Sequence, residues 1–300
     1  MSAELSLPSL AGVPIARSPD DLRTWTATQR ASGRRISFVP TMGALHAGHM
    51  ALVDHARERA EAVVVSVFVN PLQFGPREDL DAYPRTLPAD AELCRAHGVG
   101  LIFAPTAAAM YPGGFETHVE PGALAERWCG ASRPGHFRGV ATVVAKLLNL
   151  VMADVAVFGE KDWQQLQVIA RMSRDLNHPT EIVGVPTLRE PDGLALSSRN
   201  VFLTSEERRG ARSIPDALRE AQDKASAGEC DAARLIAAIV GRVSDAGGRV
   251  DFVGIVDPET LVSCSSIDGP AQVLIAAYFG STRLIDNARL TSAQSRSVGV

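Results

Sequence analysis

Ile36-Ser37-Phe38-Val39-Pro40-Thr41-Met42-Gly43-Ala44-Leu45-His46-Ala47-Gly48-His49 is the stretch that decides the fold of this chain. Its first four residues are an apolar run, which predicts a buried strand. After the second histidine, apolar residues recur at helical spacing: Met50, Leu52, Val53, Ala56 and Ala60. We therefore expect a strand, a turn of small residues and a helix, with the His-x-Gly-His motif where the helix begins.

A helix start of this kind suits phosphate, because it offers free backbone N–H groups and the positive end of the helix dipole. Gly43 and Gly48 permit a close approach of backbone or ligand. The two histidines could instead be half of a metal site or ordinary surface residues. A metal site needs further Cys, His or carboxylate ligands at suitable spacing, and none is obvious nearby. The pattern therefore favours a nucleotide-phosphate site.

Composition narrows the class of protein. A chain of 300 residues suggests about two domains. The net charge of -4 gives no reason to expect nucleic-acid binding. Four scattered cysteines without a C-x-x-C pair fit a reduced, cytoplasmic setting. The first residues, Met1–Glu4, lack a basic segment, so Leu5–Ala16 makes a poor signal peptide, and no apolar stretch reaches membrane-spanning length.

The first part of the chain alternates strand-like and helix-like segments. The predicted strands are Arg34–Val39, Ala62–Asn70, Gly100–Ala104, Val155–Phe158 and Glu181–Val185. One predicted helix carries an apolar stripe at Val140, Val143, Val144, Leu147, Leu148 and Val151. This alternation predicts an α/β fold, with a parallel sheet covered by helices on both faces and ligands at the carboxyl ends of its strands.

The pattern changes after Pro186, and we predict a domain boundary near Thr187, giving domains 1–187 and 188–300. Asp192-Gly193 predicts a turn, and Thr204 to Glu207 predicts a capping box that opens a helix. Ala-rich helices to about Gly247 and strands at Val250–Val256 and Gln272–Tyr278 then indicate a smaller α+β domain. The polar tail from Thr291 is expected to be loose.

Four further segments carry polar side chains suited to chemistry. Asn70 and Gln73 are neutral groups that both donate and accept hydrogen bonds and suit a hydroxyl or carboxylate substrate, although loop capping is the better explanation of this segment taken alone. Lys161, Asp162 and Gln165 follow a predicted strand. Ser197, Ser198 and Arg199 form a loop suited to phosphate. The fourth segment, Arg133–Gly139, places positive charge at the start of the striped helix, for catalysis or for structural contacts.

Together these motifs resemble the bacterial pantoate–β-alanine ligase family, also called pantothenate synthetases, within the His-x-Gly-His nucleotidyltransferases. The resemblance runs from about Arg34 to Asn287, through segments that match in order: Pro40–His49, Phe68–Gly75, Tyr83–Thr86, Arg133–Val140, Phe158–Gln165, Asp192–Asn200 and Thr282–Asn287. It implies a Rossmann-like nucleotide-binding domain, a smaller C-terminal α+β lid domain and a homodimer. The implied substrates are ATP, pantoate and β-alanine, with Mg²⁺ as cofactor.

The resemblance also implies roles for individual residues. The positions it assigns to ATP are Met42, Gly43, Ala44, Leu45, His46, Ala47, Gly48, His49, Gly159, Glu160, Lys161, Asp162, Leu188, Leu196, Ser197, Ser198 and Arg199. Those assigned to the small substrates are Pro40, Asn70, Gln73 and Gln165. The catalytic set is His46, His49, Lys161 and Arg199, with His49 as proton donor, and no protein ligand for a metal is named.

The expected reaction forms pantoyl adenylate and pyrophosphate, after which β-alanine displaces AMP to give pantothenate. Two alternatives remain open. A nucleotidylyltransferase that transfers AMP to a phosphate acceptor should have a cationic acceptor site, whereas Asn70, Gln73 and Gln165 are neutral. A non-catalytic nucleotide-binding regulator would not need the second phosphate-facing loop at Ser197–Arg199.

Overall fold

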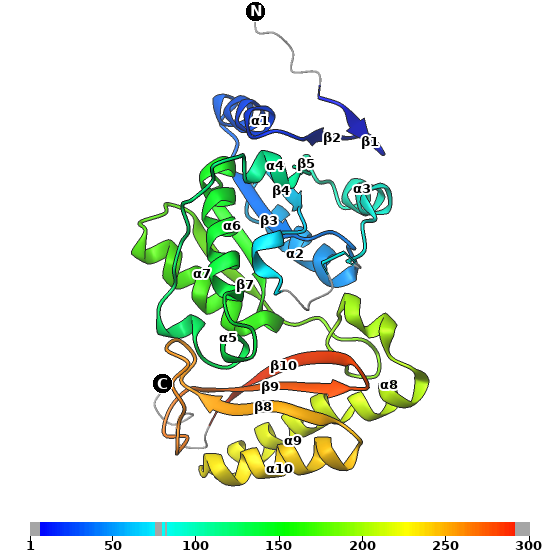
Figure 1. Ribbon diagram of the computed structural model, residues 1–300, viewed down its shortest axis with the longest axis vertical. Helices are drawn as coiled ribbons and strands as arrows, with labels where there is room; N and C mark the ends of the chain where they lie inside the picture. Colours follow the sequence, from blue (N-terminus) through cyan, green and yellow to red (C-terminus); the bar gives the residue numbers. More distant parts are fainter. Residues whose placement is uncertain (1–6, 76–79, 82, 292–300) are drawn as a thin grey trace, which may run out of the picture. The chain divides into compact units, whose positions relative to one another are not determined.

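The computed structural model describes residues 7–75, 80–81 and 83–291 (Figure 1). The expectations for Met1–Glu4 and for the tail beyond Thr291 fall outside these residues. The chain divides into two compact units. The first comprises the residues up to Ala125, Gly130–Glu160 and Val168–Pro186, and the second comprises Glu126–Cys129, Lys161–Gln167 and the residues from Thr187 onward. Two short segments from the first part of the sequence thus pack with the second unit.

The first unit is built on one sheet, whose strand order is β1-β2-β5-β4-β3-β6-β7. Its strands are β1 (Ser9–Leu10), β2 (Val13–Ala16), β3 (Ile36–Thr41), β4 (Ala62–Val67), β5 (Leu101–Phe103), β6 (Val155–Gly159) and β7 (Glu181–Val185). Every neighbouring pair is parallel except β1 with β2. The predicted α/β class with a largely parallel sheet is confirmed.

Two predicted strands differ from the observed ones by more than one residue at their carboxyl ends. β3 continues through Pro40 to Thr41, where the threonine hydroxyl donates to the carbonyl of Ser66 at 2.6 Å. The sheet tolerates Pro40 because β6 pairs only with Ser37 and Phe38 on that side. β4 ends at Val67 instead of Asn70, and the chain then enters a 3₁₀ turn, η1 (Pro71–Gln73).

Helices cover both faces of this sheet. They are α1 (Pro19–Ala31), α2 (Ala47–Arg57), α3 (Leu87–Ala96), α4 (Ala107–Met110), α6 (His136–Val151) and α7 (Trp163–Asp175), with α5 (Cys129–Ser132) and the 3₁₀ turns η2 (Ala123–Ala125) and η3 (Glu160–Asp162) between them. Side chains of α2 and α3 share a core with the sheet, while α1 and α6 pack together. All six residues of the predicted apolar stripe on α6 are buried.

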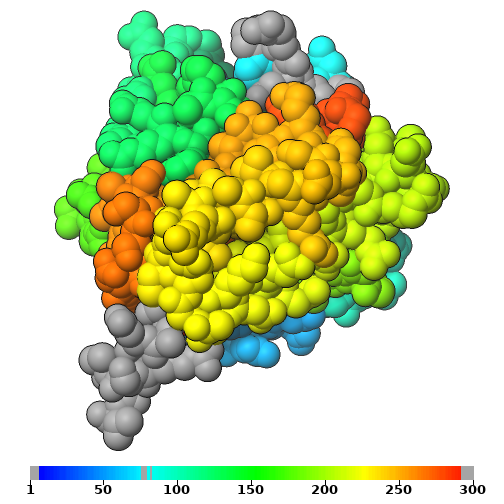
Figure 2. Space-filling view, turned by 90° about the horizontal axis from the view of Figure 1, so that it is seen from below, coloured from blue at the N-terminus to red at the C-terminus, as the bar shows by residue number. Residues whose placement is uncertain are grey.

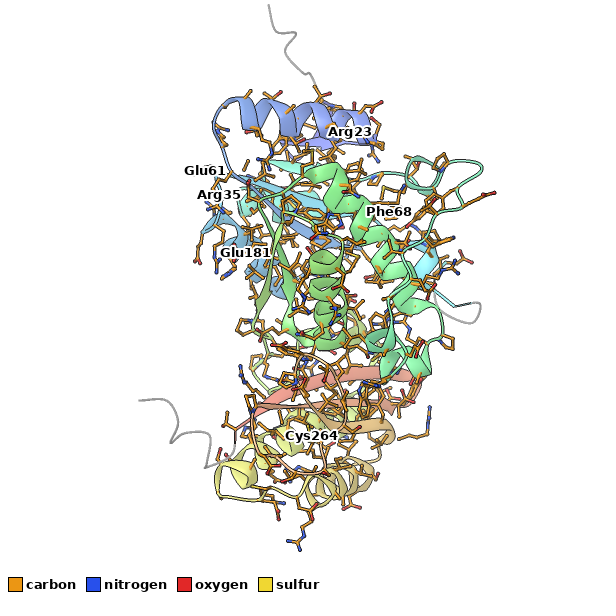
Figure 3. All side chains as sticks on the ribbon, turned by 90° about the vertical axis from the view of Figure 1, so that its left-hand side faces the viewer. Arg23, Arg35, Glu61, Phe68, Glu181 and Cys264 are labelled. Atoms are coloured by element: carbon orange, nitrogen blue, oxygen red, sulfur yellow. The ribbon has the colours of Figure 1, made fainter. Side chains whose placement is uncertain are left out.

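The sheet reverses its winding between β3 and β6, because the chain adds β4 and β5 on one side and β7 on the other. Ligands of such sheets bind beyond the carboxyl ends of the strands at this reversal. Figure 3 labels Arg35, Glu61 and Glu181 at the opposite, amino ends of β3, β4 and β7, and Phe68 just beyond the carboxyl end of β4. β3 therefore delivers the His-x-Gly-His motif to the ligand-binding edge.

The second unit contains an antiparallel sheet of order β10-β9-β8. Its elements are the 3₁₀ turn η4 (Ser198–Phe202), α8 (Ser205–Ala211), α9 (Ser213–Ser226), α10 (Ala232–Asp245), β8 (Arg249–Val256), β9 (Ala271–Phe279) and β10 (Thr282–Leu290). α9 and α10 cover one face of this sheet and share its core; α10 is the yellow helix in the foreground of Figure 2. The predicted capping box from Thr204 to Glu207 is confirmed. No helix in the described ranges is long and apolar enough to cross a bilayer.

A close backbone contact in the first unit fixes where η1 lies. A Cβ atom at Gly139, on α6, would stand 2.2 Å from the carbonyl oxygen of Leu72 and 2.6 Å from the nitrogen of Gln73. Both are backbone atoms, so they cannot turn aside. Only glycine permits this approach of α6 to η1.

We expect Gly139→Ala to lower the free energy of unfolding by about 1–3 kcal/mol, because the added methyl must displace backbone. Gly241→Ala is the matched control: Gly241 is also helical, in α10, with nothing within 4 Å of an added Cβ. This control should be neutral or stabilising by up to about 1 kcal/mol. Denaturant unfolding curves measure both, and equal stability of the two variants would contradict the close contact.

Candidate active site

The two histidines of the motif cap the helix that they open. His46 is the N-cap of α2, and its Nδ1 accepts the N–H of Gly48 at 3.1 Å. The N–H of His46 in turn donates to Nδ1 of His49 at 3.3 Å. The ring centroids lie 4.1 Å apart. One pair of hydrogen bonds thus fixes both rings against the backbone.

These bonds determine the tautomer of each ring. An Nδ1 that accepts a hydrogen bond carries no proton, so the neutral imidazole holds its proton on Nε2. Each ring can then donate from Nε2 without first becoming a cation. The geometry gives His46 and His49 the character of neutral donors placed next to each other at the carboxyl end of β3.

The start of α2 offers fewer free backbone N–H groups than the sequence suggests. Gly43 donates to the hydroxyl of Thr41 at 3.1 Å. Ala44 and Leu45 donate to the two carboxylate oxygens of Asp90, at 3.2 and 2.8 Å. Together with the bonds of His46 and Gly48, five N–H groups of the turn and first helical residues are already used within the chain. Donors toward a phosphate at this point are therefore mainly side chains.

Asn70 and Gln73 form an amide pair that also bonds to Tyr111. Asn70 is 1% exposed, and its amide nitrogen donates to Gln73 Oε1 at 3.0 Å and to the carbonyl of Gly139 at 3.1 Å. Its oxygen accepts from Leu72 N and, at 2.7 Å, from the Tyr111 hydroxyl. Asn70 thus caps η1 and orients Gln73, while its expected contact with substrate stays a prediction.

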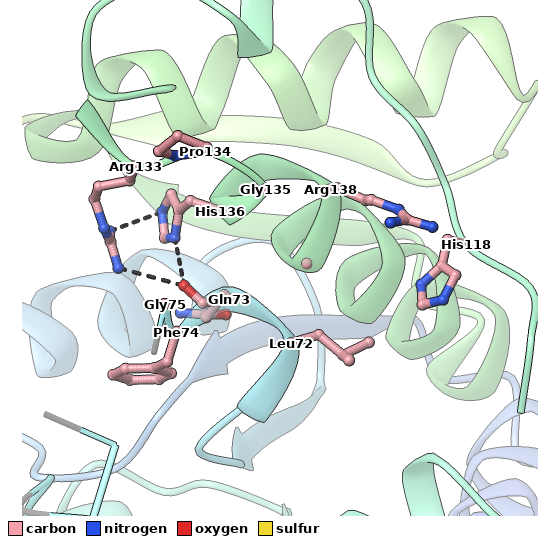
Figure 4. A pocket seen from close by; sticks show the side chains of 11 residues that line it. Leu72, Gln73, Phe74, Gly75, His118, Arg133, Pro134, Gly135, His136 and Arg138 are labelled. Carbon is pink, nitrogen blue, oxygen red and sulfur yellow. Dashed lines mark hydrogen bonds between the residues drawn. The ribbon is translucent and has the colours of Figure 1, made fainter. Parts of the chain in front are cut away.

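Gln73 links this amide pair to the histidine motif. Its Nε2 lies 3.1 Å from the sulfur of Met42, which belongs to the turn before the motif. Its main-chain carbonyl accepts from His136 Nδ1 at 2.9 Å and from Arg133 at 3.4 Å (Figure 4). These two residues border a pocket of about 230 Å³, lined also by His118 and Arg138. The segment Arg133–Gly139 therefore fixes the backbone of Gln73.

The segment after β6 packs with the C-terminal sheet inside the second unit. The carbonyl of Lys161 accepts the side-chain N–H of Asn287, on β10, at 2.9 Å. Trp163 donates from Nε1 to the carbonyl of Pro258 at 2.9 Å. Gln164 is bonded to the backbone at Cys129 and Arg127. Its neighbour Gln165 is half-buried and makes no side-chain hydrogen bond to another described residue.

The loop from Leu188 to Arg199 is anchored in the same unit. Leu196 N donates to the carbonyl of Leu188 at 2.9 Å, which closes a short hairpin. Ser197 caps η4 by accepting the N–H of Arg199. Arg189 makes a bidentate pair with Asp286, at 2.7 and 3.1 Å. Ser198 and Arg199 thus lie at the start of a 3₁₀ turn held by its own cap.

The structure distributes the predicted site residues over both units. Pro40, Met42–His49, Asn70, Gln73, Gly159 and Glu160 belong to the first unit. Lys161, Asp162, Gln165, Leu188 and Leu196–Arg199 belong to the second. The convergence of the two sets on one ligand stays a prediction. Among the described residues, no group of three or more His, Cys, Asp or Glu side chains could hold a metal ion.

Sequence reasoning gave no role to Asp90, Asn287 or Asp286. Asp90 looks like any acidic residue of an amphipathic helix, and only its 1% exposure distinguishes it. Asn287 and Asp286 lie in the matched segment Thr282–Asn287, which was the available signal for them. All three act on backbone or on other side chains, which residue type and spacing alone do not reveal.

A doubly wound, largely parallel sheet with polar motifs beyond the carboxyl ends of its strands is typical of nucleotide-binding folds. The chain belongs to the pantoate-beta-alanine ligase family, whose model matches residues 14–289. The protein is thus a ligase.

Known members are similar along nearly the whole chain. Pantothenate synthetase of Rhizorhabdus wittichii is 54% identical over 280 residues, which cover 93% of this chain and 99% of that protein. A crystal structure of pantothenate synthetase from Thermus thermophilus superposes with a TM-score of 0.87 at 48% identity, covering 91% and 98% of the two chains. A crystal structure of pantoate-beta-alanine ligase from Francisella tularensis, with beta-gamma ATP and beta-alanine bound, superposes with a TM-score of 0.77 at 32% identity. The match covers 92% of this chain and 97% of that one.

We expect Tyr111→Phe to be about 1 kcal/mol less stable than the wild type at pH 8, because Asn70 loses a buried donor. Burial raises the pKa of the Tyr111 phenol above its ordinary value. The stabilisation that the protonated phenol gives to the folded protein is therefore complete below the unfolded pKa of about 10, and it is lost as the pH rises further. The difference between the two proteins should therefore shrink above about pH 10. Unfolding curves from pH 8 to 11 measure it, and parallel curves would contradict the assignment.

Proposed function

We propose that this protein condenses pantoate with β-alanine at the expense of ATP, forming pantothenate, AMP and pyrophosphate through pantoyl adenylate. The observation that carries the proposal is the pair of Nε2 donors, His46 and His49, beside the Met42–Gln73 contact in a chain of this ligase family. The Francisella tularensis relative, which was crystallised with beta-gamma ATP and beta-alanine, supports the same substrates here.

In the first step, a carboxylate oxygen of pantoate attacks the α-phosphorus of ATP. The bond from this phosphorus to the bridging oxygen breaks, and pyrophosphate leaves. A carboxylate is already ionised near pH 7, so no general base is needed. Gln73 and Gln165 would hold pantoate without adding negative charge beside two anions. Catalysis then rests on alignment and on donors that meet the charge developing on pyrophosphate.

The donors assigned to the triphosphate combine neutral and cationic groups. His46 and His49 would donate from Nε2, with His49 as the proton donor to the phosphate oxygens. The cationic and hydroxyl partners are Lys161, Ser197, Ser198 and Arg199. Leu188 and Leu196, which pair across a hairpin, would place the loop that carries the last three. Gly159, Glu160 and Asp162 complete the proposed ATP contacts.

Mg²⁺ belongs to this proposal as an ion carried by the nucleotide. Mg²⁺ in such sites binds mainly phosphate oxygens and water. The described residues contain no cluster of three metal-binding side chains. The side chains assigned to the triphosphate therefore fit an ion whose main ligands are the phosphate oxygens of ATP. When bound, the ion neutralises charge on the phosphates.

In the second step, the neutral amine of β-alanine attacks the acyl carbon of the adenylate, AMP leaves, and the nitrogen loses a proton. AMP is a good leaving group, so proximity supplies most of the rate. We further propose that the second unit acts as a lid that excludes water while the hydrolysable adenylate exists. The proposed working form is a homodimer. We place it in the cytoplasm, because the four cysteines, all of them described, are free thiols, which fits a reducing compartment.

Pyrophosphate exchange tests the proposed function. Labelled pyrophosphate should enter ATP in the presence of pantoate, and β-alanine should not be required, because the first step is complete without the amine. Exchange only in the presence of β-alanine would contradict a discrete adenylate. Exchange with a phosphorylated acceptor in place of pantoate would indicate a nucleotidylyltransferase, and binding of ATP without exchange would indicate a regulator.

We expect His49→Ala and Lys161→Ala each to slow adenylate formation roughly 10²–10³-fold, as loss of a preorganised donor does elsewhere. Their effect on ATP affinity should be smaller, because these donors act most strongly as charge moves to pyrophosphate. With preformed pantoyl adenylate and β-alanine, both variants should show a far smaller deficit. Single-turnover measurements separate the two steps.

Two variants serve as controls. His55→Ala removes another histidine of α2, and Lys224→Ala removes a lysine of α9; neither residue belongs to the proposed site. Both should keep near-wild-type rates. If His49→Ala and Lys161→Ala damage the two half-reactions equally, their assignment to the triphosphate is wrong.

A further inference from the structure

Asp90 is a buried carboxylate that the proposed reaction does not use. It lies on α3 and is 1% exposed. In the described part of the chain, no Lys, Arg or His lies within ion-pair distance of it. Its partners are instead three hydrogen-bond donors: Ala44 N, Leu45 N and the hydroxyl of Thr86, the last at 3.1 Å.

A carboxylate in such a position needs donors, because burying one without compensation is very unfavourable. Successive backbone N–H groups of a turn form a concave nest that binds anions, and in phosphate-binding loops the anion belongs to the ligand. Here the N–H groups of Ala44 and Leu45 converge on Asp90. The nest in front of the histidine motif is therefore filled by the protein's own carboxylate.

The backbone of this turn is one that side chains rarely adopt. Gly43 has φ of 84° and Ala44 has φ of 51°. The left-handed region is unfavourable for a residue with a Cβ atom, such as Ala44. A Cβ at Gly43 would also stand 2.9 Å from Val67 Cγ1 and 3.1 Å from Asp90 Oδ2. The conformation persists because surrounding contacts fix it, and the polar ones among them include the two bonds to Asp90 and the bond from Gly43 N to the Thr41 hydroxyl.

The turn leads directly into the capped histidines. Leu45 is the residue before His46, whose backbone N–H is bonded to His49 and whose ring is bonded to Gly48. A rotation of the peptide at Ala44 or Leu45 therefore changes the direction of both imidazoles. The carboxylate of Asp90 acts on the same two peptides.

We propose that Asp90 is a positioning residue for the reaction: its carboxylate holds the Gly43–Leu45 turn in its left-handed conformation and so fixes where the Nε2 atoms of His46 and His49 lie. The inference deepens the proposed function, since it rests on the proposed role of these two histidines. It assigns to α3 a part in adenylate formation that passes through the turn, without contact to a substrate.

The direct test is Asp90→Asn, which preserves the size of the side chain but replaces one acceptor by an NH₂ group. The imidazole nitrogens are followed by ¹⁵N NMR in the protein without substrates. In the wild type we expect protonated Nε2 and unprotonated Nδ1 for both rings, and slow hydrogen exchange at the amides of Ala44 and Leu45. In Asp90→Asn the two tautomers should mix. Rapid exchange of these amides in the wild type would overturn the proposal even if the variant does not fold.

Kinetics provide the second readout. Asp90→Asn should lower kcat of pantoate-dependent pyrophosphate exchange roughly 10–100-fold, the effect expected of a small displacement of reacting groups. KM for pantoate should stay within about threefold, and the reaction of preformed adenylate with β-alanine should be much less affected. A wild-type-like kcat, or equal loss in both half-reactions, would overturn the proposal.

Rescue distinguishes positioning from simple structural support. Ala44→Gly removes the Cβ that opposes the left-handed backbone, so in the Asp90→Asn background it should restore kcat roughly fivefold relative to Asp90→Asn alone. Thr86→Val is the matched control, because it deletes a hydrogen bond to the same carboxylate without touching the turn. Its kcat should stay within about threefold of the wild type.

The NMR test needs no activity, so the failure of the proposed function and the failure of this inference are distinguishable. A wild type that does not exchange pyrophosphate, yet shows the fixed tautomers and their loss in Asp90→Asn, would retain the positioning geometry and reject the reaction. A rescue that does not occur would reject the role of Asp90 in the turn.

Discussion

The parallel pairing of β3 with β4 on one side and β6 on the other is the constraint on which the first unit depends. Ile36, Phe38 and Val39 are fully buried, so this strand has no room for chemistry along its length. Polar side chains suited to chemistry are found only beyond the last residues of β3 that pair with its neighbouring strands. The carboxyl end of β3 is therefore the place where the backbone turns through a strained conformation, and where two histidines cap the start of a helix.

The polar groups around that end form two layers. The imidazoles of His46 and His49 and the amide of Gln73 form the outer layer, in which hydrogen bonds to neighbouring atoms hold each side chain. Behind them, Asp90 and Asn70 are buried and Tyr111 is half-buried, and all three bond mainly to backbone or to one another. The side chains of the inner layer restrict the positions of those in the outer layer. Donors held in this way favour catalysis, because they need not reorganise when charge develops.

The sequence allowed the prediction of those parts of the fold that depend on runs of apolar residues. β3, β4, β6 and the striped helix α6 follow from such runs, as does the start of the helix at the His-x-Gly-His motif. β10 was missed because polar residues such as Arg283, Asp286 and Asn287 interrupt its apolar pattern. In the site, the histidines were singled out by type and spacing, and Gln73 received its role from the family resemblance. Asp90 was found in neither way, since its importance lies in burial and in two backbone bonds across 45 and 46 positions of sequence.

The hydrogen bond from Asn287 to the carbonyl of Lys161 also affects when this part of the protein can fold during synthesis. The two residues are 126 positions apart, and at bacterial or eukaryotic rates of synthesis the ribosome needs roughly 6–25 s to pass from one to the other. During that interval β3, β4 and β6 already exist as chain, whereas the segment at Lys161 still lacks the strand that holds it. The backbone at Lys161 can therefore reach its final setting only after Asn287 has been synthesised, so a nascent chain whose parallel sheet has already formed still lacks this part of the proposed site.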